Sequence, residues 1–271
     1  MSVRSSEHPG RAAGVSPRFS LVAAAVAALL LAPPTAGAAP EEIQVYMNEM
    51  DPQGQFGLDV HNNYTFSGSA ALDYPGEQSD VRRYRLTPEF SYGLTSNIEL
   101  GAYLPLATLD SRGDLALDGV KGRIKYIGPQ SSETAWWGLN LEIGRVDRAL
   151  DINPWNGELK LIAGARFGRW TLAANGNLDF VVSGPRRDPP TLDVDTKLAY
   201  RVAKQLQLGL ETYNGLGPFS RLGDFARQDQ AVYAVADASV RKWDLNLGLG
   251  HGYGGSKDGW VLKAIVGVPI E

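Results

Sequence analysis

The stretch FGLDVHNNYTF, residues 56–66, decides the fold class of this chain because its side chains alternate in character. A period of two is that of a β-strand with two unlike faces. In a soluble sheet the polar face meets bulk water, whereas in a membrane barrel the apolar face meets lipid and the polar face meets an enclosed lumen. One parity holds Phe56, Leu58, Val60, Tyr64 and Phe66, and the other holds Asp59, His61, Asn63 and Thr65. Asn62 falls on the apolar parity, against the pattern.

Alternating segments of this kind recur to the end of the chain, and most are near the 9–11 residues that a tilted strand needs to cross a bilayer. Pro88 and Pro105 each remove a donor from the strand ladder, so bulges are expected near them, and the weak alternation of residues 230–240 leaves their register open. We predict strands at 55–66, 82–93, 97–106, 119–128, 135–146, 158–167, 169–182, 191–202, 206–213, 230–240, 243–253 and 259–270.

The connections between these segments alternate between short and long. LTSN (94–97) and RK (241–242) are tight turns, whereas ATLDSRGDLALDG (107–119) and NGLGPFSRLGDFARQDQ (214–230) are extended loops. Short periplasmic turns and long outer loops are typical of outer-membrane barrels. The sequence therefore predicts an all-β, closed antiparallel transmembrane barrel of about twelve strands, located in the cell outer membrane.

Aromatic residues on the apolar parity support this assignment. They gather at the two ends of the strands, around a band of aliphatic residues, as rings do at the lipid headgroups. The periplasmic set is Phe56, Tyr92, Tyr126, Trp137, Phe167, Trp170, Tyr200 and Trp243, and the outer set is Tyr64, Phe66, Tyr84, Phe180, Tyr253 and Trp260.

The N-terminus predicts export. Three arginines precede the apolar run LVAAAVAALLLA (21–32), and small residues follow at Ala36-Gly37-Ala38, as in a secretory signal peptide. We expect residues 1–38 to be the signal peptide, with cleavage after Ala38 or Ala39, then a periplasmic segment at 39–53 and the barrel at 54–271. The alternative for 21–32 is a single membrane anchor. With 30 acidic and 26 basic residues the chain has no basic patch for nucleic acid.

The polar parity predicts a charged lumen. Basic residues gather on the second and fourth strands, and acidic residues on the seventh to ninth, which lie opposite in a ring of twelve. We hypothesise a transverse field that orients polar solutes; the alternative is ion pairs that fill the lumen and leave no path, since twelve strands lie between filled and open barrels. The basic set is Arg83, Arg85, Lys121, Arg123 and Lys125; the acidic set is Asp179, Asp193, Asp195 and Glu211; the first strand adds Asp59, His61 and Asn63.

No catalytic site, metal site or cofactor is predicted. His61 points inward and His251 outward on strands that are not neighbours, so they do not form a pair of metal ligands. A single lumen histidine beside Asp59 could bind a cation or solute, but a hydrogen-bonded histidine explains it as well. No G-x-S-x-G motif is present, and a lipid or peptide hydrolase is the third functional class after a channel and a non-conducting barrel.

Three stretches together resemble a known group. EIQVYMNEMDPQGQFGLDVHNNYTFSG (42–68), RLTPEFSYGLTSNIELGAYLPL (85–106) and WDLNLGLGHGYG (243–254) look like proteobacterial outer-membrane β-barrel proteins of the phenol-degradation meta-pathway, or transporter, type. The resemblance implies a barrel and solute uptake, and it implies no catalytic residues.

The expected function is passage of small polar or aromatic solutes through the charged lumen. The alternative is a non-conducting barrel that acts through its outer loops as an adhesin, receptor or structural protein. Expected partners are outer-membrane lipid, lipopolysaccharide, the barrel-assembly machinery and a small solute.

Overall fold

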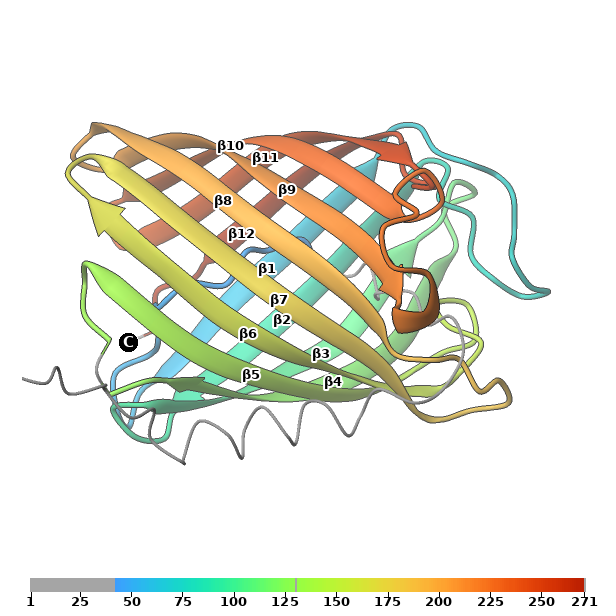
Figure 1. Ribbon diagram of the computed structural model, residues 1–271, viewed down its shortest axis with the longest axis horizontal. Coiled ribbons are helices and arrows are strands. Elements are labelled where there is room, and N and C mark those ends of the chain that lie inside the picture. Colours follow the sequence, from blue (N-terminus) through green and yellow to red (C-terminus); the bar gives the residue numbers. More distant parts are fainter. Residues whose placement is uncertain (1–41, 130, 271) are drawn as a thin grey trace, which may run out of the picture. The chain divides into compact units, whose positions relative to one another are not determined.

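Twelve antiparallel strands form a closed barrel in the computed structural model, which describes residues 42–129 and 131–270 (Figure 1). The predicted signal peptide and its cleavage site lie outside the described residues. The strands are β1 (Phe56–Thr65), β2 (Arg83–Gly93), β3 (Ile98–Leu109), β4 (Leu115–Ile127), β5 (Ala135–Val146), β6 (Trp155–Phe167), β7 (Trp170–Ser183), β8 (Thr191–Ala203), β9 (Leu206–Pro218), β10 (Asp229–Val240), β11 (Trp243–Gly254) and β12 (Trp260–Gly267), and a 3-10 turn, η1 (Phe219–Arg221), follows β9.

Each strand pairs with its neighbours in sequence, and β1 pairs with β12 to close the ring. At the closure Val60 lies opposite Val266 and Tyr64 lies opposite Leu262. Closure leaves no strand edge with unpaired backbone groups, which is what a sheet surrounded by lipid requires. The predicted closed barrel of twelve strands is confirmed.

The turns at one end of the barrel are tight and the loops at the other end are long (Figure 1). We call these the short-turn end, with turns such as 204–205 and 241–242, and the long-loop end, with loops such as 66–82 and 184–190. Several predicted bounds are wrong. β3 and β4 continue to Leu109 and from Leu115, so their loop shrinks to 110–114; β6 begins at Trp155, β9 continues to Pro218 and β12 ends at Gly267. The ladder continues past Pro105 because register shifts between Tyr103 and Ala107 absorb the missing donor.

Large apolar side chains cover the outside of the barrel. Trp137, Trp170 and Trp243 are exposed near the short-turn end, Tyr253 and Trp260 near the long-loop end, and leucines between them. Ring pairs reinforce each end, including Trp170 with Tyr200 at 4.8 Å between centroids and Tyr64 with Phe66 at 4.9 Å. An exposed aliphatic band between aromatic ends is the surface that a bilayer covers. The barrel is therefore an outer-membrane barrel.

Among the described residues, no helix is long and apolar enough to cross a membrane.

Asn62 faces outward, and its amide is satisfied locally. Its Nδ2 donates to the backbone oxygen of Val60 at 2.9 Å, and the Tyr84 hydroxyl donates to its Oδ1 at 2.6 Å. A polar amide on this face is therefore tolerated because a neighbouring strand supplies its partner.

Candidate functional site

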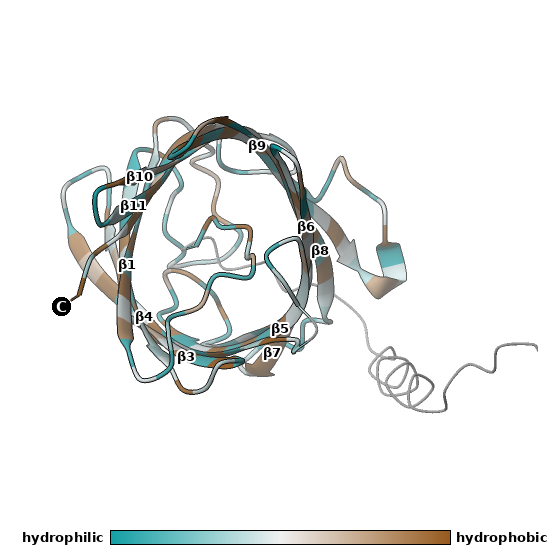
Figure 2. Cartoon of the chain, turned by 90° about the vertical axis from the view of Figure 1, so that its left-hand side faces the viewer, coloured by the Kyte–Doolittle hydropathy of each residue, from teal (hydrophilic) through white to brown (hydrophobic). Residues whose placement is uncertain are grey.

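The lumen contains a piece of the chain itself. Residues 42–53 precede β1 and lie within the barrel, where the sequence analysis expects a periplasmic segment. Figure 2, which looks into the short-turn end, shows backbone inside the ring of strands. We call residues 42–53 the lumen segment. Its placement follows from its composition, because it offers both apolar side chains and backbone groups to a wall that is mostly polar.

Asn175 on β7 holds the middle of the lumen segment. Its Oδ1 accepts from the Tyr46 amide at 2.6 Å, and its Nδ2 donates to the Tyr46 carbonyl at 2.9 Å. This pairing takes the place of a strand partner, so the backbone of Tyr46 is satisfied, although the segment pairs with the sheet only at its end, where Gln53 bridges to Gly93.

The Tyr46 side chain is buried among charged groups of the wall. Its hydroxyl lies 2.5 Å from the Tyr103 hydroxyl and donates to Glu142 Oε1 at 3.2 Å. The Nζ atoms of Lys160 and Lys125 lie 4.5 and 5.2 Å from its ring centroid. The ring therefore gains cation–π attraction on its faces while its polar tip is hydrogen-bonded.

The lumen segment also makes a hydrophobic contact with an apolar patch inside the barrel. Val45 and Tyr46 pack with Trp136, Ile162 and Ala173, all of which are buried. These wall residues stand on the polar parity of their strands, which was predicted to form a charged and polar lumen face. The adjacent tryptophans 136 and 137 are the signal that could have revealed it, since neighbouring positions in a strand must face opposite ways.

Charged wall residues hold the two ends of the lumen segment. Lys125 Nζ donates to the carbonyl of Glu49 at 2.5 Å, and Arg166 Nη2 lies 2.8 Å from Glu49 Oε1. At the other end Lys263 Nζ donates to the carbonyl of Ile43 at 3.0 Å. The segment is thus attached by polar contacts along its length, each of them reversible.

Asp51 anchors the segment where it turns back into β1. Its amide donates to Glu99 Oε2 at 2.6 Å, and its Oδ2 accepts from the Ser91 hydroxyl at 2.5 Å. Partial burial raises the pKa of the Asp51 carboxyl. Its carboxylate is therefore held by a neutral donor and not by a cation.

The predicted basic residues face the lumen and most have local partners. Arg83 pairs with Asp80 and with Asp258, the latter at 3.2 Å. Arg123 pairs with Glu89 at 2.5 Å and Glu99 at 2.8 Å. Arg85 and Lys125 are buried and Lys121 is half-buried.

The predicted acidic residues also face the lumen. Asp195 accepts from Asn177 Nδ2 at 2.7 Å, and Asp179 and Asp193 lie near it on β7 and β8. Glu211 stands between two ammonium groups, paired with Lys263 and with Lys197, the latter at 3.0 Å. The first strand contributes half-buried Asp59 and buried Asn63 and His61, and His61 Nε2 lies 3.0 Å from Glu89 Oε2.

These contacts modify the hypothesis of a transverse field. Arg123 and Glu211 find opposite charges within their own sector of the wall, and the lumen segment lies between the two sectors. A charge paired at contact distance projects little field across the barrel. The charges of Arg123 and Glu211 therefore add little to a transverse field, and the field itself stays a hypothesis.

Two cavities adjoin the lumen segment. One of about 620 Å³ lies at the short-turn end and is lined by segment residues from Gln44 to Asp51 and by wall residues that include Lys197, Arg201, Asp237 and Asp244. The other, of about 50 Å³, is lined by Glu42, Lys121, Glu142, Lys160 and Asp179. Water and small solutes therefore have room on one side of the segment, and far less on the other.

The barrel resembles solved outer-membrane channels. Among them are the COG4313 outer membrane channel from Pseudomonas putida F1 (13% identity, TM-score 0.58, covering 83% of this chain and 99% of that one) and the KdgM porin in complex with disordered oligogalacturonate (10% identity, TM-score 0.54, covering 79% and 99%). The NanC porin matches at 11% identity and a TM-score of 0.50, covering 79% and 99%.

The fold is that of outer-membrane channels. At these identities the likeness extends to the fold alone. No protein-family profile matches the chain, and no curated protein matches it in sequence.

Proposed function

We propose that the protein is a channel for small solutes across the outer membrane, and that the lumen segment must be displaced for passage. The observation that carries this proposal is a polar lumen occupied by a segment held without covalent bonds. Asn175, Lys125 and Lys263 bind the segment through its backbone, and water can take over each of these contacts.

The wall favours hydration once the segment leaves. Its inward residues include Arg123, Glu142, Lys160 and Asp195, which would line a water-filled path. A barrel filled only for stability would be expected to use apolar side chains there, because buried ion pairs add little to stability. The lumen chemistry thus supports passage over permanent closure.

The solute class that fits best is small molecules that combine an aromatic ring with a polar group. The inner wall offers Tyr103, Trp136, Tyr213 and Tyr233 beside its charged residues, so a ring could stack while its polar group is hydrated. The resemblance of residues 42–68 and 85–106 to the phenol-degradation meta-pathway type supports the same class.

The proposed partners follow from the location. Outer-membrane lipid and lipopolysaccharide surround the barrel, and the barrel-assembly machinery inserts it. We propose that the protein is not an enzyme, because its barrel resembles solved channels.

Conductance measurements test the proposal. A variant lacking residues 42–50 should show larger and more frequent single-channel openings than the full barrel in planar bilayers, and liposomes containing it should take up phenol faster. The matched control is an alanine-substituted segment of the same length. Folded barrels that stay silent with and without the segment would contradict a channel.

A second candidate is a role through the outer loops. Lys257 Nζ binds Asp73 Oδ2 at 2.8 Å and Glu77 Oε1 at 2.9 Å, and Arg148 Nε donates to the carbonyl of Pro75 at 3.0 Å. The longest loop is therefore tied to two others, which would present a fixed surface to a receptor. Binding of cells or matrix proteins that is lost on deleting residues 70–79 would favour this role.

A further inference from the structure

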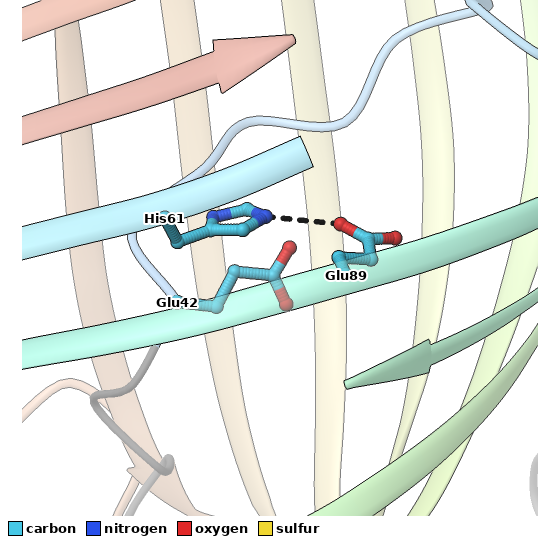
Figure 3. A group of neighbouring side chains, drawn as sticks. All are labelled: Glu42, His61 and Glu89. Carbon is cyan, nitrogen blue, oxygen red and sulfur yellow. Dashed lines mark hydrogen bonds and ion pairs between the residues drawn. The ribbon is translucent and has the colours of Figure 1, made fainter. Parts of the chain in front are cut away.

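Three side chains with metal-binding atoms converge where the lumen segment meets the wall. Glu42 comes from the segment, His61 from β1 and Glu89 from β2, and one ligand atom of each lies within 4.8 Å of the other two. Figure 3 shows the two carboxylates beside the imidazole. Within residues 42–129 and 131–270 this is the one such group of three or more.

The wall fixes two of the three side chains. His61 and Glu89 are 1% and 2% exposed, on paired strands whose register places Asp59 opposite Glu89 and His61 opposite Thr87. Arg123 Nε donates to Glu89 Oε1 at 2.5 Å, so the other oxygen, Oε2, is directed at the imidazole. An outer partner that orients a carboxylate in this way is typical of metal ligands.

Polar atoms at this position lack partners. Glu42 Oε1 is enclosed and forms no hydrogen bond with the part of the chain that the structure describes, and the same holds for the hydroxyl of Thr87, opposite His61. Buried polar atoms are nearly always satisfied, so an orphaned set gathered at one point indicates a missing ligand.

We propose that Glu42, His61 and Glu89 bind a divalent first-row transition metal ion, with Zn²⁺ as the probe. One imidazole nitrogen and two carboxylate oxygens are ligands that Zn²⁺ accepts, and water completes the tetrahedron. Ca²⁺ and Mg²⁺ prefer six or more oxygens, which the imidazole does not supply. Glu42 and Glu89 balance the charge of the ion, and Glu99 balances Arg123, so the loaded group is neutral in a buried position.

The geometry needs only a small adjustment. Ligand atoms about 2.0–2.1 Å from a tetrahedral zinc lie roughly 3.3 Å apart. His61 Nε2 and Glu89 Oε2 are already 3.0 Å apart. Glu42 makes up the remaining difference, since it sits on a segment and not on a strand of the barrel.

The ion would fasten the start of the lumen segment to two adjacent strands. Its effect on conductance rests on the proposed function, whereas binding of the ion does not. The competing interpretation is a metal-free triad, in which a protonated His61 lies between the two carboxylates.

Metal titration of the folded barrel separates these interpretations. The protein should carry a purification tag without histidine, be stripped with a chelator, and be titrated with Zn²⁺ by calorimetry. We expect one ion per chain, and d–d absorption of a low-coordinate site when Co²⁺ is used instead. Glu42→Gln and His61→Gln should each weaken binding by at least tenfold, as loss of even an outer partner of a metal ligand costs 10–100-fold.

Two matched variants serve as controls. His251→Gln removes the histidine that lies outside, against Trp260 at 4.8 Å, and Glu133→Gln removes an exposed glutamate that is absent from the cluster. Both should bind Zn²⁺ as the unchanged protein does. Heat-modifiable migration on gels verifies that each barrel is folded, and Glu42→Gln alters a position before the first strand, so its result does not depend on refolding.

The outcomes are distinct. Binding that is stoichiometric and lost in Glu42→Gln and His61→Gln supports the site, whereas absent binding, or binding equal in all variants, overturns it. If Zn²⁺ binds at the site but the barrel never conducts with or without the ion, the site stands and the proposed channel function fails.

Discussion

The side-chain amide of Asn175 binds both backbone polar groups of Tyr46, at 2.6 Å to the nitrogen and 2.9 Å to the oxygen. One side chain of the wall thus satisfies the backbone hydrogen bonds of Tyr46, as a neighbouring strand does for residues of the barrel. The docked state of the segment therefore depends on a contact that a single substitution removes.

Asn175→Ala should release the lumen segment more often. Two neutral hydrogen bonds contribute about 1 kcal/mol each, so the undocked fraction should rise roughly 30-fold. The chain has no cysteine, so a Met47→Cys variant reports undocking through its rate of labelling by a maleimide.

Asn177→Ala is the matched control for that prediction. Asn177 lies on the same strand and faces the lumen, but donates to Asp195 and not to the segment. Its labelling rate should stay within about twofold of the parent's, because the substitution removes no hydrogen bond to the segment. Equal labelling of the Asn175 and Asn177 variants would contradict the role assigned to Asn175.

Glu49→Gln should have a much weaker effect on the segment. Glu49 pairs with Arg166, but its side chain is 61% exposed, and exposed ion pairs contribute about 0–1 kcal/mol. We expect the rate of labelling at position 47 to rise less than about fivefold. A larger rise would mean that this ion pair, more than the buried backbone contacts, holds the segment.

Glu211→Leu should destabilise the barrel by about 3–5 kcal/mol, because it leaves buried ammonium groups without their anion. Lys263 is the more affected, since Lys197 keeps Asp237 at 2.8 Å. The urea midpoint of the folded band on gels measures the change. The double variant Glu211→Leu/Lys263→Met should recover most of the loss; a double variant as unstable as the single would refute the charge argument.

Tyr84→Phe should cost about 1–3 kcal/mol, because it leaves Asn62 Oδ1 without its donor on the lipid-facing side. The Tyr84 hydroxyl reaches that oxygen at 2.6 Å. The same urea assay applies. Combining Tyr84→Phe with Asn62→Leu removes both polar groups and should restore stability, whereas an unaffected Tyr84→Phe variant would show that another group satisfies the amide.

Lys257→Met should loosen the longest outer loop. Lys257 holds Asp73 and Glu77 in residues 66–82, and these contacts are half-exposed. We expect faster cleavage within this loop by an added protease while the barrel itself stays resistant. Lys242→Met, at the short-turn end, is the control; similar cleavage in both variants would argue against the tie.

The twelve strands were predictable because a strand between lipid and lumen alternates at every second residue. The closing pair β1–β12 follows from strand number once both partners are recognised. The bounds of β3 and β4 could not be predicted, because the alternation of side chains ends at Pro105 whereas bulges let the strand pairing continue beyond it.

The inward direction of the charged residues follows from parity, but their partners do not. Arg123 could pair with Glu89 on β2 or with an acidic residue across the barrel. The choice depends on strand register and lumen width, which the alternation of side chains along one strand does not give. The contact of Glu42 with His61 and Glu89 was likewise hidden, since Glu42 lies in a segment without periodicity.

By itself the sequence determined the strand count, the lipid-facing surface and the charged interior, because each depends on local alternation and composition. Only the tertiary structure decided that residues 42–53 lie in the lumen and that the contact of Asn175 with Tyr46 holds them there. The physical reason is that a segment without regular structure takes its partners from the surface it meets, and that surface exists only after the barrel closes.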